Sequence, residues 1–148
     1  MDKRAADVLC CMQMTVPFLA CMLLTASVYH LPPRVLPAIL AVEGGSPGSV
    51  HLNKDRSEDL GVMQINTLWI APLARQTGLP QASVRSRLIN ESCFNIAAAG
   101  LIMRKYLNET KGELLLAVGN YHSHTPFLNQ TYQVKVLDAA RSMFASAR

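Results

Sequence analysis

A glutamate on the apolar face of a short helix is the feature that most constrains this chain. The stretch from Leu36 to Leu40 and beyond has apolar residues at the three- and four-residue spacing that places side chains on one helical face. Glu43 follows Leu40 by three residues, so its carboxyl group shares that face. Gly44 and Gly45 then end the helix and leave room for a ligand. The pattern indicates a general acid with a raised pKa, or a solvated glutamate in the last turn of an ordinary helix.

Length and composition predict one small folded domain. The chain has 148 residues, of which 50% are hydrophobic and 16% are charged. A single core can therefore form, and a disordered charged tail is excluded. The formal net charge of +4 suits an anionic polymer such as nucleic acid, acidic lipid or cell-wall glycan. No cluster of Lys and Arg is dense enough to indicate nucleic acid, and we expect no nucleic-acid partner.

The N-terminal part of the sequence is typical of an export signal. Basic residues precede an apolar run at residues 8–28, and small residues near Ala26 provide a cleavage point. The run is also long enough to remain uncleaved as a membrane tether. We therefore expect residues 1–28 to be a signal peptide or membrane anchor helix and residues 32–146 to be the folded domain.

The cysteines provide no predicted disulfide within that domain. Cys10, Cys11 and Cys21 all lie in the expected leader, which leaves Cys93 without a partner. We expect Cys93 to be a small core residue, because a nucleophilic role would need a histidine beside it.

The remaining sequence predicts a mainly α-helical fold. Residues 46–59 are polar and form a loop with room for a short hairpin. Beyond the helix that ends at Gly44, helices are expected at about 67–76, 83–88, 93–107, 113–120 and 127–145. There is no internal repeat, domain linker or series of strands, so we expect a single helical domain.

Three further stretches carry polar groups that packing does not explain. Gln64 is an amide inside the apolar run at 60–66, and a buried amide needs a partner in the protein or in a ligand. Five hydrogen-bonding side chains follow an aliphatic helix at 120–124, a usual place for a binding loop. Tyr132 is predicted on the inner face of the last helix, where its hydroxyl can reach a carboxylate. Each feature also fits an ordinary buried or solvated polar residue.

Together these stretches resemble the lysozyme-like lytic transglycosylases of the SLT type. The most specific match is Gly-Val-Met-Gln-Ile-Asn at 61–66, close to the family's Gly-Leu-Met-Gln-Ile-Asn. The resemblance covers about residues 33–145 and is to the small members that accompany type IV secretion, conjugation and pilus systems. The other matching stretches follow the family's order and are Ala-Val-Glu at 41–43, Asn-Ile-Ala-Ala-Ala-Gly at 95–100, residues 117–123 and Tyr132.

The resemblance implies a lysozyme-like fold and a lyase activity on peptidoglycan. The bond cleaved would be the β-1,4 link between N-acetylmuramic acid and N-acetylglucosamine, with a 1,6-anhydro product. Glu43 corresponds to the catalytic acid and base, and Tyr132 to the residue that orients it. The substrate-binding positions would be Met63, Gln64, Asn66, Asn120, Tyr121, His122 and Tyr132.

The resemblance also bears on cofactors, partners and location. It implies no cofactor, and the alternating His122 and His124 lack a third metal ligand at a familiar spacing, so we expect no metal site. The expected partners are peptidoglycan strands and an envelope-spanning secretion, conjugation or pilus complex. The expected location is the periplasm, with residues 8–28 as a potential inner-membrane tether.

Three positions depart from the family pattern. Gly44 stands where a serine is usual, His122 replaces an asparagine, and His124 replaces a glycine. These changes concern the rate and the substrate preference more than the class of reaction. The paired cysteines of many small relatives are also missing, because Cys93 has no partner at the usual position.

Two alternative functions remain open. A lysozyme-type hydrolase needs a second carboxylate roughly 5–9.5 Å from Glu43. The candidates lie in the polar loop and are Asp55, Glu58 and Asp59. Their clustering with basic residues is also typical of a solvated loop. A non-catalytic wall-binding or assembly subunit would keep the groove and have lost activity through the departures at Gly44 and His122.

Overall fold

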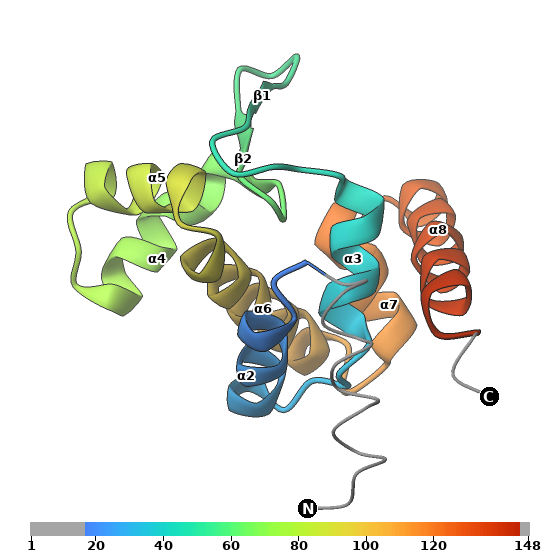
Figure 1. Ribbon diagram of the computed structural model, residues 1–148. Helices are drawn as coiled ribbons and strands as arrows, with labels where there is room; N and C mark the ends of the chain where they lie inside the picture. The colour runs from blue at the N-terminus through green and yellow to red at the C-terminus, as the bar shows by residue number, and fades with distance from the viewer. Residues whose placement is uncertain (1–16, 146–148) are drawn as a thin grey trace, which may run out of the picture.

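The long helix α6 (Ser92–Glu109) is the axis of the fold. The computed structural model describes residues 17–145. Within this range α6 packs against α2 (Leu19–Tyr29), α5 (Gln81–Asn90) and α7 (Leu114–His122) (Figure 1). The helical prediction for this part of the chain is confirmed.

The core lies along the inner face of α6. Ile96, Met103 and Leu107 are buried there, as their helical spacing predicted. Gly100 lets α2 approach closely, because a Cβ at this position would lie 2.2 Å from the Thr25 side chain. The fully buried side chains from other elements include Met22, Leu36, Ile39, Leu60, Met63, Ile65, Val84 and Leu88.

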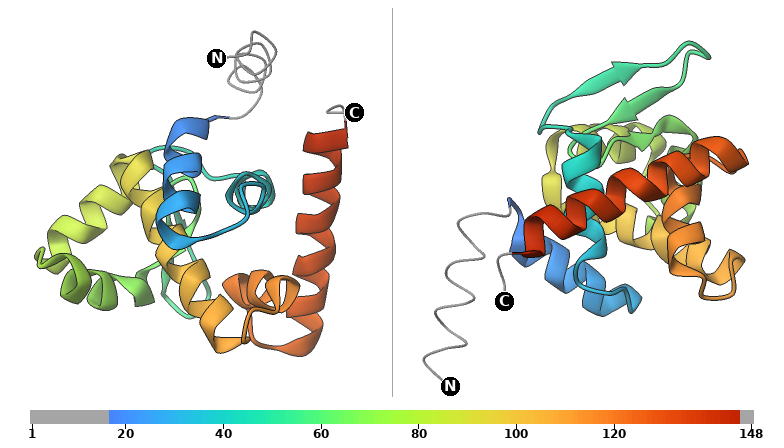
Figure 2. Two further views of the ribbon diagram at one scale, coloured as in Figure 1. Left: turned by 90° about the horizontal axis from the view of Figure 1, so that it is seen from below. Right: turned by 90° about the vertical axis from the view of Figure 1, so that its right-hand side faces the viewer.

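Helices α3 (Val35–Glu43) and α8 (Pro126–Phe144) pack against each other, and α8 also packs against α7 (Figure 2). Gly44 ends α3 as predicted, in a left-handed conformation with φ of 63°. Pro126 starts α8, where its missing N–H costs nothing because the first turn of a helix leaves that group unpaired. These two ends place residues 43 and 126–132 on the same side of the molecule.

A small antiparallel sheet stands at one edge of the helices. Its strands are β1 (Val50–Leu52), β2 (Glu58–Leu60) and β3 (Ile65–Asn66), in the order β1-β2-β3. The β1–β2 hairpin projects away from the helices (Figure 1). Val50 of β1 pairs with Leu60 of β2, and Asp59 of β2 pairs with Asn66 of β3. The hairpin fits the predicted polar loop. The third strand was not predicted, because two residues are too few to show an alternating pattern.

The helix predicted at 67–76 consists of two pieces. A 3₁₀ turn, η1 (Thr67–Trp69), precedes α4 (Ile70–Thr77). Asn66 caps the turn, since its Oδ1 accepts a hydrogen bond of 3.0 Å from the backbone N–H of Leu68. Leu68 itself is 66% exposed, so it does not contribute to the core.

Helix α2 packs against α6, although its residues fall within the predicted signal peptide or anchor. Met22 is fully buried, and Thr25 and Ala26 are also buried. An apolar run beside basic residues suits an export signal and a core helix equally well. Residues 1–16, which hold the rest of the predicted signal or anchor, lie outside the described residues. No helix within 17–145 is long and apolar enough to cross a membrane.

A disulfide joins Cys21 of α2 to Cys93 of α6. Their Cα atoms are 5.5 Å apart, and 72 positions separate them in the sequence. The prediction that Cys93 has no partner is therefore wrong. Cys93 is also exposed, so it is not the core residue that we expected.

Candidate active site

Glu43 lies at the last residue of α3 and meets Tyr132 of α8. The Tyr132 hydroxyl donates a hydrogen bond of 2.5 Å to Oε1 of Glu43. Tyr132 is 4% exposed and belongs to the hydrophobic core. The contact follows from the packing of α3 on α8, and it agrees with the predicted inward position of Tyr132.

The surroundings of Glu43 favour its protonated form. Burial raises the pKa of Glu43 above its ordinary value, and the nearby charge of Asp59 raises it further. The hydrogen bond from Tyr132 and the charge of Lys135 act in the opposite direction without cancelling the effect of burial.

The Tyr132 hydroxyl donates a hydrogen bond to Glu43 but does not give up its proton. Burial and the neighbouring Glu43 raise the pKa of Tyr132 far above its ordinary value, so the phenol stays protonated. Because Tyr132 donates to Oε1, a proton carried by Glu43 resides on Oε2. This arrangement leaves one defined oxygen to act as the acid.

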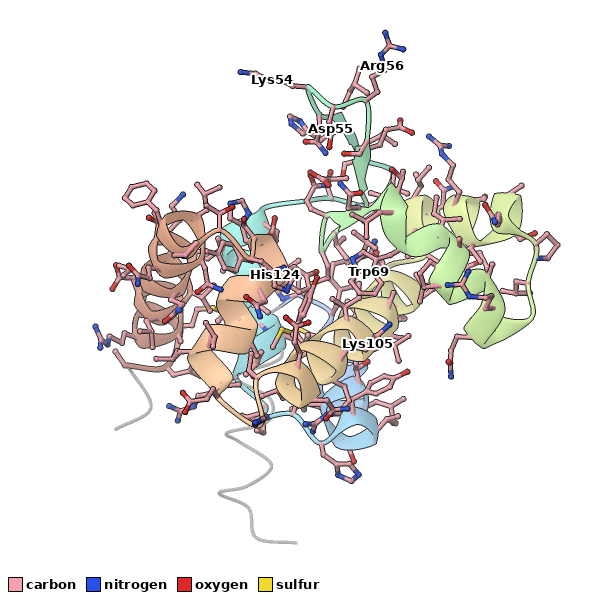
Figure 3. The ribbon with its side chains drawn as sticks, turned by 180° about the vertical axis from the view of Figure 1, so that it is seen from behind. Lys54, Asp55, Arg56, Trp69, Lys105 and His124 are labelled. Atoms are coloured by element: carbon pink, nitrogen blue, oxygen red, sulfur yellow. A yellow bond between two sulfur atoms is a disulfide. The ribbon has the colours of Figure 1, made fainter. Side chains whose placement is uncertain are left out.

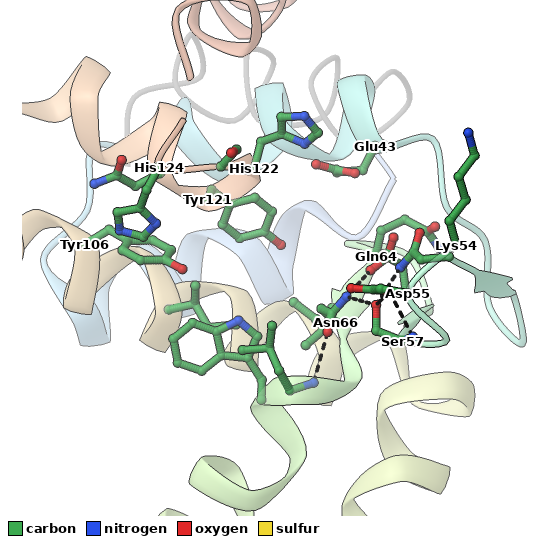
Figure 4. Close-up of a pocket in the computed structure, with 18 residues that line it drawn as sticks. Glu43, Lys54, Asp55, Ser57, Gln64, Asn66, Tyr106, Tyr121, His122 and His124 are labelled. Carbon is green, nitrogen blue, oxygen red and sulfur yellow. Dashed lines mark hydrogen bonds between the residues drawn. The ribbon is translucent and has the colours of Figure 1, made fainter. Parts of the chain in front are cut away.

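Glu43 and His122 each line two cavities. The larger cavity has a volume of about 540 Å³ and extends along β2, β3 and α6 (Figure 4). Its lining includes the predicted site residues Gln64, Asn66, Asn120, Tyr121 and His122. The smaller cavity has a volume of about 210 Å³ and is lined by Val42, Glu43, His122, Leu128, Thr131, Tyr132 and Lys135.

Gln64 reaches the larger cavity from a tight turn. Its backbone is left-handed, with φ of 52°, and its Nε2 donates to the carbonyl oxygen of Gly61 at 2.9 Å. A second contact, to Oγ of Ser49, measures 3.3 Å. The buried amide that the sequence singled out is thus held by the protein and lines the cavity.

Met63 does not line the cavity, contrary to the prediction. Its side chain is fully buried in the core. The reversed backbone at Gln64 turns that side chain toward the cavity and leaves the Met63 side chain on the core side. The carbonyl oxygen of Met63 accepts a hydrogen bond of 2.9 Å from the Tyr121 hydroxyl, and this contact ties α7 to the turn.

Asn95 of α6 holds the turn at 61–64 in place, a role that was not predicted from the sequence. Its Oδ1 accepts from the backbone N–H of Met63 at 2.9 Å. Its Nδ2 donates to the carbonyl oxygens of Leu60 at 2.7 Å and Leu88 at 2.8 Å. Because Asn95 is fully buried, these bonds satisfy its amide and hold the turn against α5 and α6. The available signal was a polar residue inside the apolar stretch at 93–103.

Asp59 is an acidic residue whose charge raises the pKa of Glu43. Its Oδ1 accepts a hydrogen bond of 3.0 Å from Nδ2 of Asn66, and both residues line the larger cavity. Asp55 also lines the cavity, but Ser57 donates to it from both its N–H and its hydroxyl, which lowers the pKa of Asp55. Glu58 instead pairs with Arg85 at 3.0 Å.

Asn120 belongs to a polar network at the other end of the cavity. Its Nδ2 donates to Oε1 of Glu109 at 3.2 Å, and its Oδ1 accepts from Nδ2 of Asn129 at 2.8 Å. The Nε2 of His124 lies 2.6 Å from the same Glu109 oxygen. Asn120 is 6% exposed, so most of its hydrogen bonding is used within the protein.

Two aromatic residues that were not predicted complete this end. Trp69 and Tyr106 meet edge to face with ring centroids 6.0 Å apart, and Tyr106 meets His124 in the same way at 5.4 Å. All three line the larger cavity (Figures 3 and 4). Lys105 lies over the Trp69 ring, 5.3 Å from its centroid. Trp69 is the one tryptophan of the sequence, which was the available signal.

His122 contacts Tyr132 directly. The two rings are stacked, with centroids 5.0 Å apart and planes inclined by 11°. Within the described residues no three His, Cys, Asp or Glu side chains are grouped so that they can hold a metal ion.

Comparison with known protein families identifies a match. The family model described as the transglycosylase SLT domain matches residues 21–135. The matched region starts inside α2 and includes Glu43, the turn at Gln64 and Tyr132. Together with the mainly helical structure, this match fits the predicted lysozyme-like fold. No curated protein is detectably similar to the chain.

Proposed function

The chain belongs to the transglycosylase SLT domain family, whose members are lytic transglycosylases that act on peptidoglycan, and from this premise we propose the reaction that it performs. The protein cleaves the β-1,4 bond between N-acetylmuramic acid and N-acetylglucosamine and leaves a 1,6-anhydro end. The observation that carries this proposal is the half-buried Glu43, which accepts a hydrogen bond from Tyr132 and lines two cavities.

In the first step Glu43 acts as the acid. The proton on Oε2 passes to the glycosidic oxygen, the bond from that oxygen to the anomeric carbon breaks, and the N-acetylglucosamine part leaves with a free 4-hydroxyl. Positive charge develops on the muramoyl ring, where the substrate's own N-acetyl group can stabilise it. The raised pKa of Glu43 serves this step, because it favours the protonated form that donates the proton.

In the second step the same residue acts as the base. The Glu43 carboxylate accepts the proton of the muramoyl 6-hydroxyl, and the oxygen of that hydroxyl bonds to the anomeric carbon. Glu43 is protonated again at the end of the cycle, and no water is consumed. A single carboxyl group is therefore sufficient, unlike in the glycosidases that use two.

Product analysis tests the proposal directly. Purified peptidoglycan is digested with the wild-type protein and with Glu43→Gln, which keeps the shape of the side chain and removes its acid function. We expect anhydro-muropeptides in the mass spectrum from the wild type only. Absence of products from folded wild-type protein would contradict the proposal and would favour a non-catalytic wall-binding subunit.

One observation favours a second candidate function, a lysozyme-type hydrolase. Asp59 lines the same cavity as Glu43, and its negative charge raises the pKa of Glu43. A carboxylate in that place can stabilise the charged sugar or hold a water molecule. Reducing sugar ends in place of anhydro ends, lost on Asp59→Asn, would support the hydrolase.

We also propose that the protein acts in the periplasm for an envelope-spanning secretion, conjugation or pilus complex. The disulfide between Cys21 and Cys93 supports an oxidising compartment, where such bonds form and persist. Crosslinking in intact cells followed by purification tests the partner. Recovery of no envelope-complex component would count against this proposal.

A further inference from the structure

His122 connects the surface of the site to the acid through one intermediate residue. It is the last residue of α7, and its imidazole is stacked on the Tyr132 ring with centroids 5.0 Å apart. Tyr132 in turn donates to Oε1 of Glu43 at 2.5 Å. Three side chains from α7, α8 and α3 therefore form one chain of contacts that ends at Glu43.

Burial shows which side of the tyrosine His122 covers. Tyr132 is 4% exposed, whereas His122 is an exposed residue that lines both cavities. The imidazole covers the phenol toward the larger cavity, which His122 lines and Tyr132 does not, whereas both residues line the smaller cavity. In Figure 4 His122 stands beside Glu43 at the cavity wall. The planes of the two rings are inclined by only 11°, so the stacked imidazole restrains the phenol ring against tilting. The Tyr132 hydroxyl lies in the plane of the phenol ring and is restrained with it.

We propose that His122 is a positioning residue, whose stacked ring keeps the Tyr132 hydroxyl on Oε1 of Glu43. The stacking energy of an aromatic pair is modest, and its effect here comes from where it acts. A hydrogen bond weakens steeply as its angle worsens, so a small tilt of Tyr132 is enough to loosen its bond to Glu43. The acid proton then has no fixed oxygen.

Two other charged side chains act on Glu43. Asp59 from β2 raises the pKa of Glu43, and Lys135 from α8 lowers it. Neither is stacked on the His122 ring. A change in the titration of Glu43 can therefore be assigned to His122, either through Tyr132, through solvent access or through the charge of the imidazole.

The direct test is titration of the Glu43 side-chain carboxyl carbon by NMR in the whole chain. The variants are Tyr132→Phe, His122→Ala and His122→Phe, with His51→Ala on β1 as a matched histidine control outside both cavities. Loss of the Tyr132 hydrogen bond removes an interaction that lowers the pKa of Glu43, so Tyr132→Phe raises it. We expect a smaller rise in His122→Ala, and values close to wild type in His122→Phe and His51→Ala.

Two NMR outcomes would overturn the inference. A fall of the Glu43 pKa in His122→Ala would show that the imidazole mainly excludes water from Glu43. Equal rises in His122→Ala and His122→Phe would assign the effect to the charge of the imidazole, because phenylalanine keeps the stacked ring and removes the charge.

A double-mutant cycle gives the kinetic test, which rests on the proposed function. We expect His122→Ala to lower kcat roughly 3- to 10-fold, the effect of one aromatic pair, with little change in KM. In the Tyr132→Phe background there is no hydroxyl to position, so His122→Ala should change kcat by less than about twofold. An increase in KM that persists in that background would make His122 a sugar contact instead. If the wild type cleaves nothing, the proposed function fails, and the NMR titration still decides the role of His122.

Discussion

Tyr132 and Glu43 are 89 positions apart in the sequence, and the hydroxyl of the first donates to Oε1 of the second at 2.5 Å. The contact is made at the place where α3 ends and α8 passes over it. Burial raises the pKa of Glu43 while this hydrogen bond lowers it. The packing of α3 on α8 therefore has two opposing effects on the pKa of Glu43, one from burial and one from the hydrogen bond.

Removal of the Tyr132 hydroxyl should slow the reaction without unfolding the protein. Tyr132→Phe keeps the buried ring, and a hydrogen bond to a charged group contributes about 1.5–3 kcal/mol, so we expect kcat to fall about 10- to 100-fold. The acid must be protonated, so kcat/KM falls as the pH rises through the pKa of Glu43. Because the substitution raises that pKa, this basic limb should move to higher pH. Unchanged turnover would remove Tyr132 from the catalytic set.

Neutralising Asp59 should have the opposite effect on the pH profile. The negative charge of Asp59 raises the pKa of Glu43, so Asp59→Asn lowers it, and the basic limb of kcat/KM should move to lower pH. Asp138→Asn on the exposed part of α8 removes the same charge elsewhere and serves as the control. The products should remain anhydro sugars, whereas complete loss of cleavage would favour the hydrolase.

The two glycines after Glu43 should respond differently to substitution. A Cβ on Gly44 meets no atom within 4 Å, so Gly44→Ala should cost about 1–2 kcal/mol through its left-handed backbone alone. A Cβ on Gly45 would lie 2.2 Å from the carbonyl oxygen of Gly61. Gly45→Ala must therefore displace the turn that carries Gln64, and we expect a loss of up to about 3 kcal/mol together with reduced turnover.

Urea unfolding and turnover measured on both glycine variants decide this point. Equal losses of stability with normal turnover would show that the turn moves aside at little cost.

Loss of the disulfide should lower stability and leave the chemistry intact. Neither Cys21 nor Cys93 lines either cavity. We expect each single replacement by serine to lower the free energy of unfolding by about 2–4 kcal/mol, because the bridge closes a long loop. The double variant should be no less stable than the single ones. A reducing agent should destabilise the wild type only, and a wild type that is insensitive to reduction would contradict the assignment.

Local patterns predicted the positions of Glu43 and Tyr132. Glu43 shares a helical face with apolar residues, and Tyr132 faces inward with Val136, which is also buried. Both conclusions need only the periodicity of one helix. Gly44 was equally predictable, because a helix that ends in a left-handed residue favours glycine.

Contacts between distant segments could not be predicted. The partner of Cys93 lies 72 positions away, in a run that also fits an export signal. The stacking of His122 on Tyr132 depends on how α7 meets α8. Met63 was misplaced for a local reason, since the left-handed backbone at Gln64 reverses the chain within a run that reads as uniformly apolar.

The position of Glu43 in the lining of two cavities has a consequence for where a strand can be cut. Glu43 lines both cavities, so a polymer bound in both would have an internal link beside its carboxyl group. On the proposed function, we therefore expect cuts within a glycan strand rather than removal of units from its ends.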